Sequence, residues 1–199
     1  MYLLIFTGLT SLPLLGVILY MRRKFGIRNF LIIHVRHSPA LTSFRGFLLV
    51  LVSLGFLVKF PMYFFHLWLP KAHVEASARG SILLAGVLLK LGAYGLYRFA
   101  RLIREVRRML IFFCVLGGAL LRILCTRITD FKVLIAYSSV VHMSPVIVGI
   151  FSQSYLGRFR SLGMSLGHGV VSSAIFFGAG ILYEKSNSRL ILFNTGILR

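Results

Sequence analysis

Residues 81–95 have the sequence SILLAGVLLKLGAYG, an uncharged and mostly apolar run that only Lys90 interrupts. Similar runs recur along all 199 residues of the chain, and 58% of its residues are hydrophobic. A helix that crosses a bilayer needs about 20 predominantly apolar residues. The sequence therefore predicts an all-α integral membrane protein with about six transmembrane helices and a single membrane domain, residues 1–199.

Six apolar runs predict where these spans lie, with polar connections between them. Pro13 and Pro145 fall inside the first and fifth spans, and each is expected to kink its helix. Residues 66–80, which contain Pro70, are predicted as a connection. The spans are placed at about 2–20, 46–65, 81–98, 109–126, 133–154 and 162–183.

The chain is strongly basic, with 23 Lys and Arg against 4 Asp and Glu and a formal net charge of +19. Such a balance is common in proteins that bind nucleic acid. Here, however, most basic residues lie in short loops between apolar runs, so the bilayer is the expected partner and no nucleic acid is expected. The loops after the first, third and fifth spans hold 13 basic residues, against 7 on the other side. They are predicted to face the matrix or cytoplasm, with both chain ends on the opposite side.

Lys90 lies deep inside the third span. It follows Ser81 by nine residues, which is roughly 14 Å of helix in a hydrocarbon core about 30 Å thick. A lysine at this depth costs about 2.5–3.5 kcal/mol even on insertion scales, so it should face protein or water. Because desolvation disfavours its charged form, it can bind and release a proton. We predict a proton-relay lysine; the alternative is a structural lysine paired with a neighbour.

Two further lysines lie in or beside the predicted spans. Lys59 directly precedes Phe60 and Pro61, and the proline cannot continue the helical hydrogen bonds, so polar backbone groups open beside it. Lys59 is therefore a candidate for the same pathway, with snorkelling to the membrane surface as the alternative. Lys132 lies at a predicted membrane edge near Asp130. A solvated pair with that aspartate is expected there, and a place in the pathway is the alternative.

Two histidines also fall at membrane depth. His142 lies nine residues into the fifth span, and His168 stands between Gly167 and Gly169. A histidine titrates near neutral pH, and small neighbours leave room for ordered water, so both suit a proton wire. A lone buried histidine is often only a satisfied core residue. Several ionisable groups at this depth favour an ion pathway, so both rings are expected to be buried near the same polar axis as Lys90.

A longer pattern connects these residues. The stretch from Val58 to Ala76, VKFPMYFFHLWLPKAHVEA, resembles the signature of the chain 4 family of mitochondrial NADH–ubiquinone oxidoreductase, the antiporter-like subunits of respiratory complex I. The resemblance covers nearly the whole chain, as the central portion of the family pattern, and is closer to animal mitochondrial members than to bacterial ones. The other matching segments are Leu88–Lys90, Thr129–Ser139 with His142 and Met143, His168–Ser173 and Tyr183–Arg189.

The resemblance implies a proton-translocating, multi-pass subunit of the mitochondrial inner membrane, built on inverted repeats with broken helices. It implies that this chain holds no cofactor, because FMN, the iron–sulfur clusters and ubiquinone belong to partner subunits. Other membrane-arm subunits of complex I are the expected partners. On the family pattern, Lys90 is the central pump lysine, Lys59 pairs with a glutamate of the preceding helix, and His168 continues the polar axis.

The chain also departs from the family pattern. Family members are longer, and the glutamates at the two ends of the axis would lie before Met1 and after Arg199. Those acids are expected from segments outside this sequence or from a separate chain. Ser77 stands where the family usually has proline. Two alternatives therefore remain: a subunit of an Mrp-type cation/proton antiporter, and a truncated piece of the arm that does not conduct. Co-purification with NADH dehydrogenase subunits would distinguish a complex I subunit from an antiporter subunit.

Overall fold

The computed structural model describes residues 2–25, 42–100, 107–152 and 154–194. Their regular structure is helical; no β-strand forms within these ranges, where Asp130 and Leu190 make an isolated bridge. The predicted all-α class is confirmed. Residues 26–41 and 101–106, which make up much of two predicted basic loops, lie outside the described residues.

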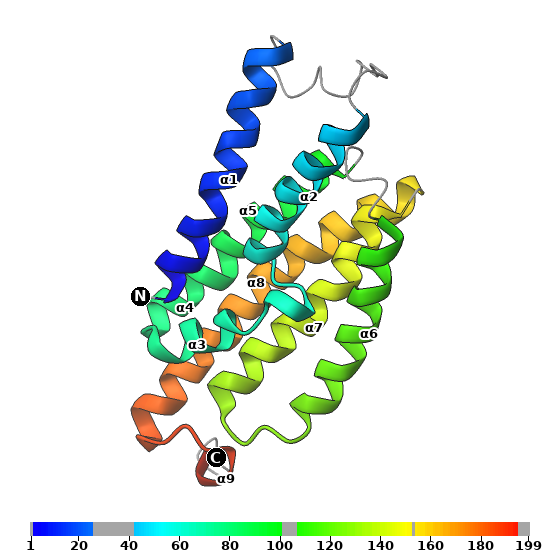
Figure 1. Ribbon diagram of the computed structural model, residues 1–199. Helices are drawn as coiled ribbons and strands as arrows, with labels where there is room; N and C mark the ends of the chain where they lie inside the picture. The colour runs from blue at the N-terminus through cyan, green and yellow to red at the C-terminus, as the bar shows by residue number, and fades with distance from the viewer. Residues whose placement is uncertain (1, 26–41, 101–106, 153, 195–199) are drawn as a thin grey trace.

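Long helices packed side by side form the bundle in Figure 1. Helix α1 packs on α2, α6 packs on α7, and α7 packs on α8. The C-terminal ends of α1, α5 and α7 lie toward the upper end of Figure 1, and the turn between α6 and α7 lies at the lower end with α9. The long helices are α1 (Tyr2–Phe25), α2 (Thr42–Lys59), α6 (Arg107–Cys125), α7 (Phe131–Phe151) and α8 (Tyr155–Ser186).

Four helical stretches in the described residues are long and apolar enough to cross a membrane: Ala78–Phe99, Arg107–Cys125, Phe131–Phe151 and Tyr155–Ser186. They occupy the predicted third to sixth spans, although α8 starts seven residues before the predicted position. Helices α1 and α2 occupy the first two, and α1 contains a shorter apolar stretch, Gly8–Tyr20. Helices α1 and α7 continue without a break through their prolines.

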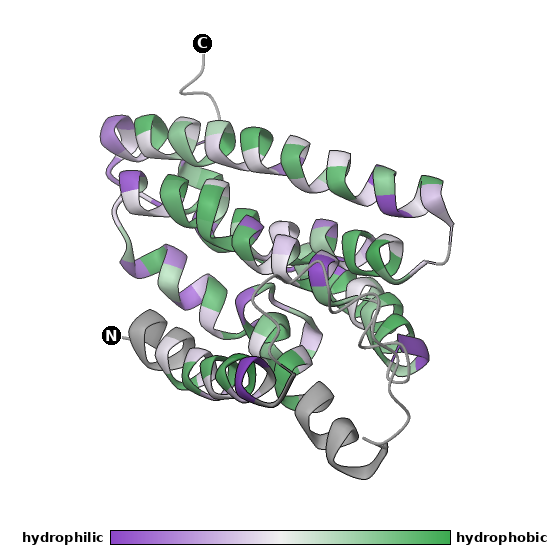
Figure 2. Cartoon of the chain, turned by 90° about the horizontal axis from the view of Figure 1, so that it is seen from above, coloured by the Kyte–Doolittle hydropathy of each residue, from purple (hydrophilic) through white to green (hydrophobic). Residues whose placement is uncertain are grey.

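The outer faces of the bundle are apolar as well as its interior. Figure 2 shows hydrophobic residues along the length of the helices. On α8, Leu166, Val170 and Phe177 are each more than 60% exposed, and on α6 Phe112 and Ile123 are too. Soluble monomers rarely expose apolar surface on this scale, so these faces fit contact with lipid or with neighbouring membrane helices.

The second predicted span is wrong at its end, because α2 stops at Lys59 rather than continuing to residue 65. Pro61 has no N–H to continue the helix. The last carbonyls of α2 find other donors: Leu57 accepts from the Met62 N–H at 3.4 Å, and Val58 accepts from the Trp68 indole N–H at 3.0 Å. The interrupted helix therefore ends inside the bundle with these backbone groups satisfied, as a low-dielectric environment requires.

The predicted connection 66–80 is also wrong, since it contains a helix. After a short 3₁₀ turn, η3 (Tyr63–Phe65), the chain forms α3 (Trp68–Glu75). Pro70 is tolerated because it lies in the first turn of α3, where its missing N–H is not needed. The pair α2 and α3 is thus a broken helix, the feature that the family resemblance implied.

The third span consists of three helical segments: α4 (Ala78–Leu83), the π-helical turn η4 (Leu84–Leu88) and α5 (Leu89–Phe99). Ser77, at the position where proline was expected, caps α4 by accepting the Gly80 N–H at 3.3 Å. Helix α5 packs on α2 and approaches its end closely. A Cβ added to Gly92 would lie 3.0 Å from the Phe60 backbone nitrogen, so glycine is needed at this crossing.

Candidate functional site

Lys90 and His168 meet in the middle of the bundle. The Lys90 Nζ lies 3.2 Å from the His168 Nδ1, and both side chains are half-buried. Lys90 is the second residue of α5, and His168 lies near the middle of α8. The two residues are 78 apart in the sequence, so only the packing of α5 on α8 brings them together. The predicted approach of His168 to Lys90 is confirmed.

Two local features make room for this contact. The π-helical turn η4 ends directly before Leu89, whose N–H reaches back to the Leu84 carbonyl, and such turns are frequent at functional sites. On the facing helix, a Cβ added to Gly169 would lie 3.0 Å from the Lys90 Cε. Gly169 therefore leaves space for the lysine side chain. Gly167 does not share this role, because nothing lies within 4 Å of its added Cβ.

His142 extends the pair along α7. Its ring centroid lies 5.7 Å from that of His168, with the rings tilted by 49°. Both histidines line a groove of about 340 Å³ between α7 and α8, together with the hydroxyls of Ser138, Ser139 and Ser172. The groove is large enough for several water molecules. His142 is nevertheless exposed, so the prediction that both rings are buried is wrong for this histidine in the chain by itself.

Lys59 lies beside this cluster but does not contact it directly. It is the last residue of α2, and its carbonyl carbon would lie 3.1 Å from a Cβ on Gly92, two residues after Lys90. Its backbone is therefore next to the helix that carries Lys90. Within the described ranges its ammonium group makes no ion pair or hydrogen bond. Its place in a pathway stays a prediction.

Lys132 lies apart from the cluster. It is ten residues before His142 on α7, roughly 15 Å along the helix axis. The predicted pair with Asp130 does not form in the described structure, because the ammonium group donates to the Ala76 carbonyl at 2.5 Å instead. Asp130 precedes α7 as its N-terminal flanking residue. Lys132 thus ties the start of α7 to the end of α3, a contact that sequence spacing does not reveal.

His73, for which the sequence pattern predicted no role, is fully buried in α3. Its ring stacks on Phe176 at 4.4 Å, with 10° between the planes. Neither ring nitrogen has a hydrogen-bond partner among the described residues. His66, seven residues earlier, is also buried and pairs through its Nδ1 with the Tyr63 carbonyl. His66 flanks the end of η3 and lies outside α3, so the seven-residue spacing of the two histidines gave no signal of their surroundings.

The cluster can hold and pass protons. No group of three or more His, Cys, Asp or Glu in the described part of the chain is placed to bind a metal ion. Lys90 carries protons to donate, and a neutral His168 carries an acceptor nitrogen at hydrogen-bond distance. His142 and the serine-lined groove continue from that nitrogen. The arrangement therefore suits relay of a proton between side chains.

Comparison with known proteins gives consistent matches. The model of the family described as "NADH:quinone oxidoreductase/Mrp antiporter, TM" matches residues 1–199. The NADH-ubiquinone oxidoreductase chain 4 of Ceratitis capitata is 44% identical over 201 residues, which cover 99% of this chain and 44% of that protein. The chain 4 protein of Mytilus edulis is 49% identical over 152 residues, covering 73% of this chain and 35% of that protein.

A solved structure agrees with these matches. A chain of respiratory complex I from Thermus thermophilus with bound NADH has a TM-score of 0.84 to this chain at 28% identity. The match covers 96% of this chain and 42% of the other. The chain therefore spans less than half the length of the relatives it matches.

Proposed function

Because this chain belongs to the NADH:quinone oxidoreductase/Mrp antiporter family of transmembrane subunits, we propose that it translocates protons in the membrane arm of respiratory complex I. The animal chain 4 relatives and the apolar helices support a multi-pass protein of the mitochondrial inner membrane. Its partners in this proposal are other membrane-arm subunits. The FMN, iron–sulfur clusters and ubiquinone of the complex belong to those partners, and this chain supplies no redox centre.

The contact between Lys90 and His168 is the observation that carries the proposal. The protonated lysine donates to the His168 Nδ1 at 3.2 Å, which requires the neutral tautomer with its hydrogen on Nε2. If both groups were charged, their repulsion at this distance would be about 5 kcal/mol at an effective dielectric constant of 20. The pair therefore carries a single positive charge. Protonation of one member drives release of a proton from the other.

The proton then has a route onward through the groove between α7 and α8. When the His168 Nδ1 takes a proton from Lys90, the ring can release its Nε2 hydrogen to water or to His142, whose ring centroid is 5.7 Å away. The serine hydroxyls of the groove can orient such water. Lys59, beside α5, is the proposed donor to Lys90 through water, and its acidic partner is supplied by a segment outside residues 1–199.

Substitution of Lys90 tests the proposal in the fully assembled complex. Lys90→Ala removes the proton carrier, and Lys90→Arg keeps a charge that cannot be released at working pH. Both variants are expected to assemble and to lose NADH:ubiquinone turnover and proton pumping together, because coupling stalls electron transfer when pumping is blocked. Lys185→Ala, an exposed lysine of α8, is the control and should retain both activities.

Normal coupled turnover in an assembled Lys90→Ala complex would refute the role of this lysine. An Mrp-type antiporter subunit is the second candidate, because the family model includes both classes. The chain 4 relatives, more than 40% identical, favour complex I. Purification of the chain without NADH dehydrogenase subunits would favour the antiporter.

A further inference from the structure

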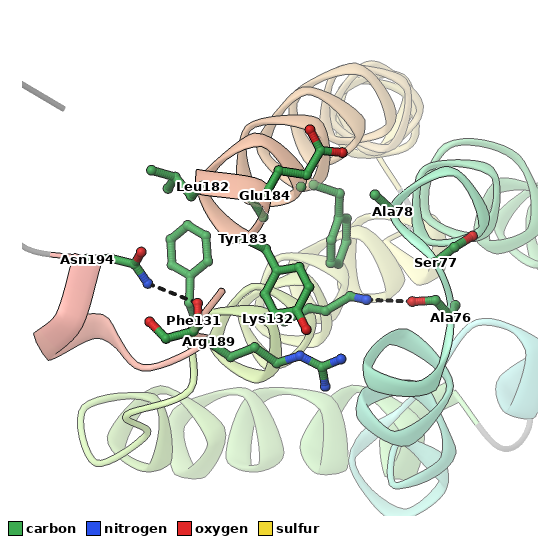
Figure 3. Close-up of a pocket in the computed structure, with 14 residues that line it drawn as sticks. Ala76, Ser77, Ala78, Phe131, Lys132, Leu182, Tyr183, Glu184, Arg189 and Asn194 are labelled. Atoms are coloured by element: carbon green, nitrogen blue, oxygen red, sulfur yellow. Dashed lines mark hydrogen bonds between the residues drawn. The ribbon is translucent and has the colours of Figure 1, made fainter. Parts of the chain in front are cut away.

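A second cavity, of about 320 Å³, lies at the far end of the bundle from the α7–α8 hairpin and away from Lys90. It is formed where the α3–α4 junction, the start of α7 and the end of α8 meet α9 (Ile191–Asn194) (Figure 3). Two backbone hydrogen bonds of 3.1 Å hold its wall, from the Phe131 N–H to the Arg189 carbonyl and from the Ile191 N–H to the Thr129 carbonyl. The cavity is thus a built part of the fold.

Two cations share this cavity. Lys132 and Arg189 both line it, and their charges repel one another. In Figure 3 both side chains extend toward Ala76. The Lys132 ammonium group gives one hydrogen to the Ala76 carbonyl at 2.5 Å, which leaves two of its three hydrogens for another acceptor. The Arg189 guanidinium lies 5.4 Å from the centre of the Tyr183 ring, which holds it in place without neutralising it.

No carboxylate among the described residues balances these charges. Glu184 lines the same cavity, but within the described residues it forms no ion pair with either cation, and Figure 3 shows its carboxylate directed away from them. The buried Ser188 hydroxyl in the cavity wall also lacks a hydrogen-bond partner among the described residues. Two repelling cations and a free hydroxyl form the donor set that an oxyanion with several acceptor oxygens would satisfy.

The depth of the cavity identifies the kind of oxyanion. Helix α8 has 32 residues, so it is roughly 48 Å long, against a hydrocarbon core of about 30 Å and a whole bilayer of about 40–45 Å. Its C-terminal end, which forms the cavity, therefore reaches the headgroup layer. Beside the cavity, α9 exposes Leu192 (76%) and Phe193 (67%), which are suited to contact acyl chains.

We propose that this cavity binds the phosphate group of an anionic phospholipid, with Lys132 and Arg189 as its charged donors. The lipid would neutralise the repulsion between the two side chains and hold the start of α7, the end of α8 and the α3–α4 junction together. This proposal is independent of proton transfer at Lys90, and its test does not depend on turnover.

Photo-crosslinking in the intact complex tests this site. The complex is reconstituted with phosphatidylglycerol that carries a photoreactive group on its acyl chain, or with phosphatidylcholine of the same chains, and labelled peptides are mapped after illumination. The anionic probe is expected to label peptides of the α8–α9 end several-fold more than the zwitterionic one. Arg189→Gln should remove this difference, and Arg189→Lys should keep it. Arg127→Gln, an exposed arginine in the turn before α7, is the matched control and should change nothing.

Three outcomes would overturn the proposal. Equal labelling by the two lipids would remove the charge selectivity on which it rests. Loss of the label on addition of millimolar inorganic phosphate would show that the cavity takes a soluble anion instead. Unchanged selectivity in Arg189→Gln would separate the lipid from this cavity. None of these results bears on Lys90, so they leave the proposed proton translocation to its own test.

Discussion

Replacing Gly169 with alanine tests the contact between Lys90 and His168 through a single methyl group. The new Cβ would lie 3.0 Å from the Lys90 Cε and 3.5 Å from the Gly86 carbonyl oxygen. Carbon atoms in contact normally stay about 3.5–4.0 Å apart, so the Lys90 side chain must shift by a few tenths of an ångström. Its Nζ, now 3.2 Å from the His168 Nδ1, would then lie beyond normal hydrogen-bond distance.

The size of the effect follows from this loss. A hydrogen bond to a charged group contributes about 1.5–3 kcal/mol, and about 1.4 kcal/mol on a barrier changes a rate tenfold. We therefore expect coupled NADH:ubiquinone turnover to fall about tenfold or more in Gly169→Ala, if the Lys90-to-His168 step controls it. Assembly should be retained, because alanine is about 1 kcal/mol better than glycine within a helix and the crowded atom belongs to a flexible side chain.

The assay compares turnover and proton uptake in sealed membrane vesicles, with native gel electrophoresis to quantify assembled complex. Gly178→Ala is the matched control, because it makes the same change on α8 with nothing within 4 Å of the added Cβ. Wild-type coupled turnover in Gly169→Ala would refute the reasoning. An equal loss in Gly178→Ala would assign the effect to the helix and not to the pair.

Three further predictions concern the broken helix, a helix crossing and the topology. Trp68→Phe should lower the thermal stability of the complex by about 1–3 kcal/mol, because it removes the donor to the Val58 carbonyl; an unchanged melting temperature would contradict this. Gly95→Ala would put a Cβ 2.1 Å from the Phe56 Cε1, so the assembled fraction should fall, and adding Phe56→Ala should restore it. Arg23→Cys, at the end of α1 predicted to face the matrix, should resist a membrane-impermeant thiol reagent in intact mitoplasts and react after permeabilisation; labelling of intact mitoplasts would reverse the topology.

Much of the membrane organisation could be predicted because it depends on local composition. The apolar run around Lys90 determines a span whatever its neighbours are, and the structure places that lysine near the middle of the helical stretch Ala78–Phe99. The small residue at Gly169 likewise indicated free space beside His168, and the structure fills that space with the lysine. In both cases one segment carried enough information by itself.

The predictions that were wrong concern contacts between segments far apart in the chain. The end of α2 at Lys59 requires the Trp68 indole to satisfy a backbone carbonyl. A hydropathy pattern does not predict such a hydrogen bond. Lys132 donates to Ala76, 56 residues earlier, and not to its neighbour in sequence. His142 is exposed because no described segment covers its side of the groove. The depth of a residue in the membrane can be predicted from a window of sequence, whereas the contact partners of its side chain are determined by how the helices pack.

The hydrogen bond from Trp68 to the Val58 carbonyl bears on how the protein enters the membrane during synthesis. Helix α2 ends beside Gly92, in the interior of the bundle, and an unsatisfied carbonyl there costs several kcal/mol in hydrocarbon. The donor that satisfies it lies ten residues later in the chain. We therefore expect α2 to leave the insertion machinery only after Trp68 has emerged from the ribosome, so that α2 and α3 enter the lipid as one unit.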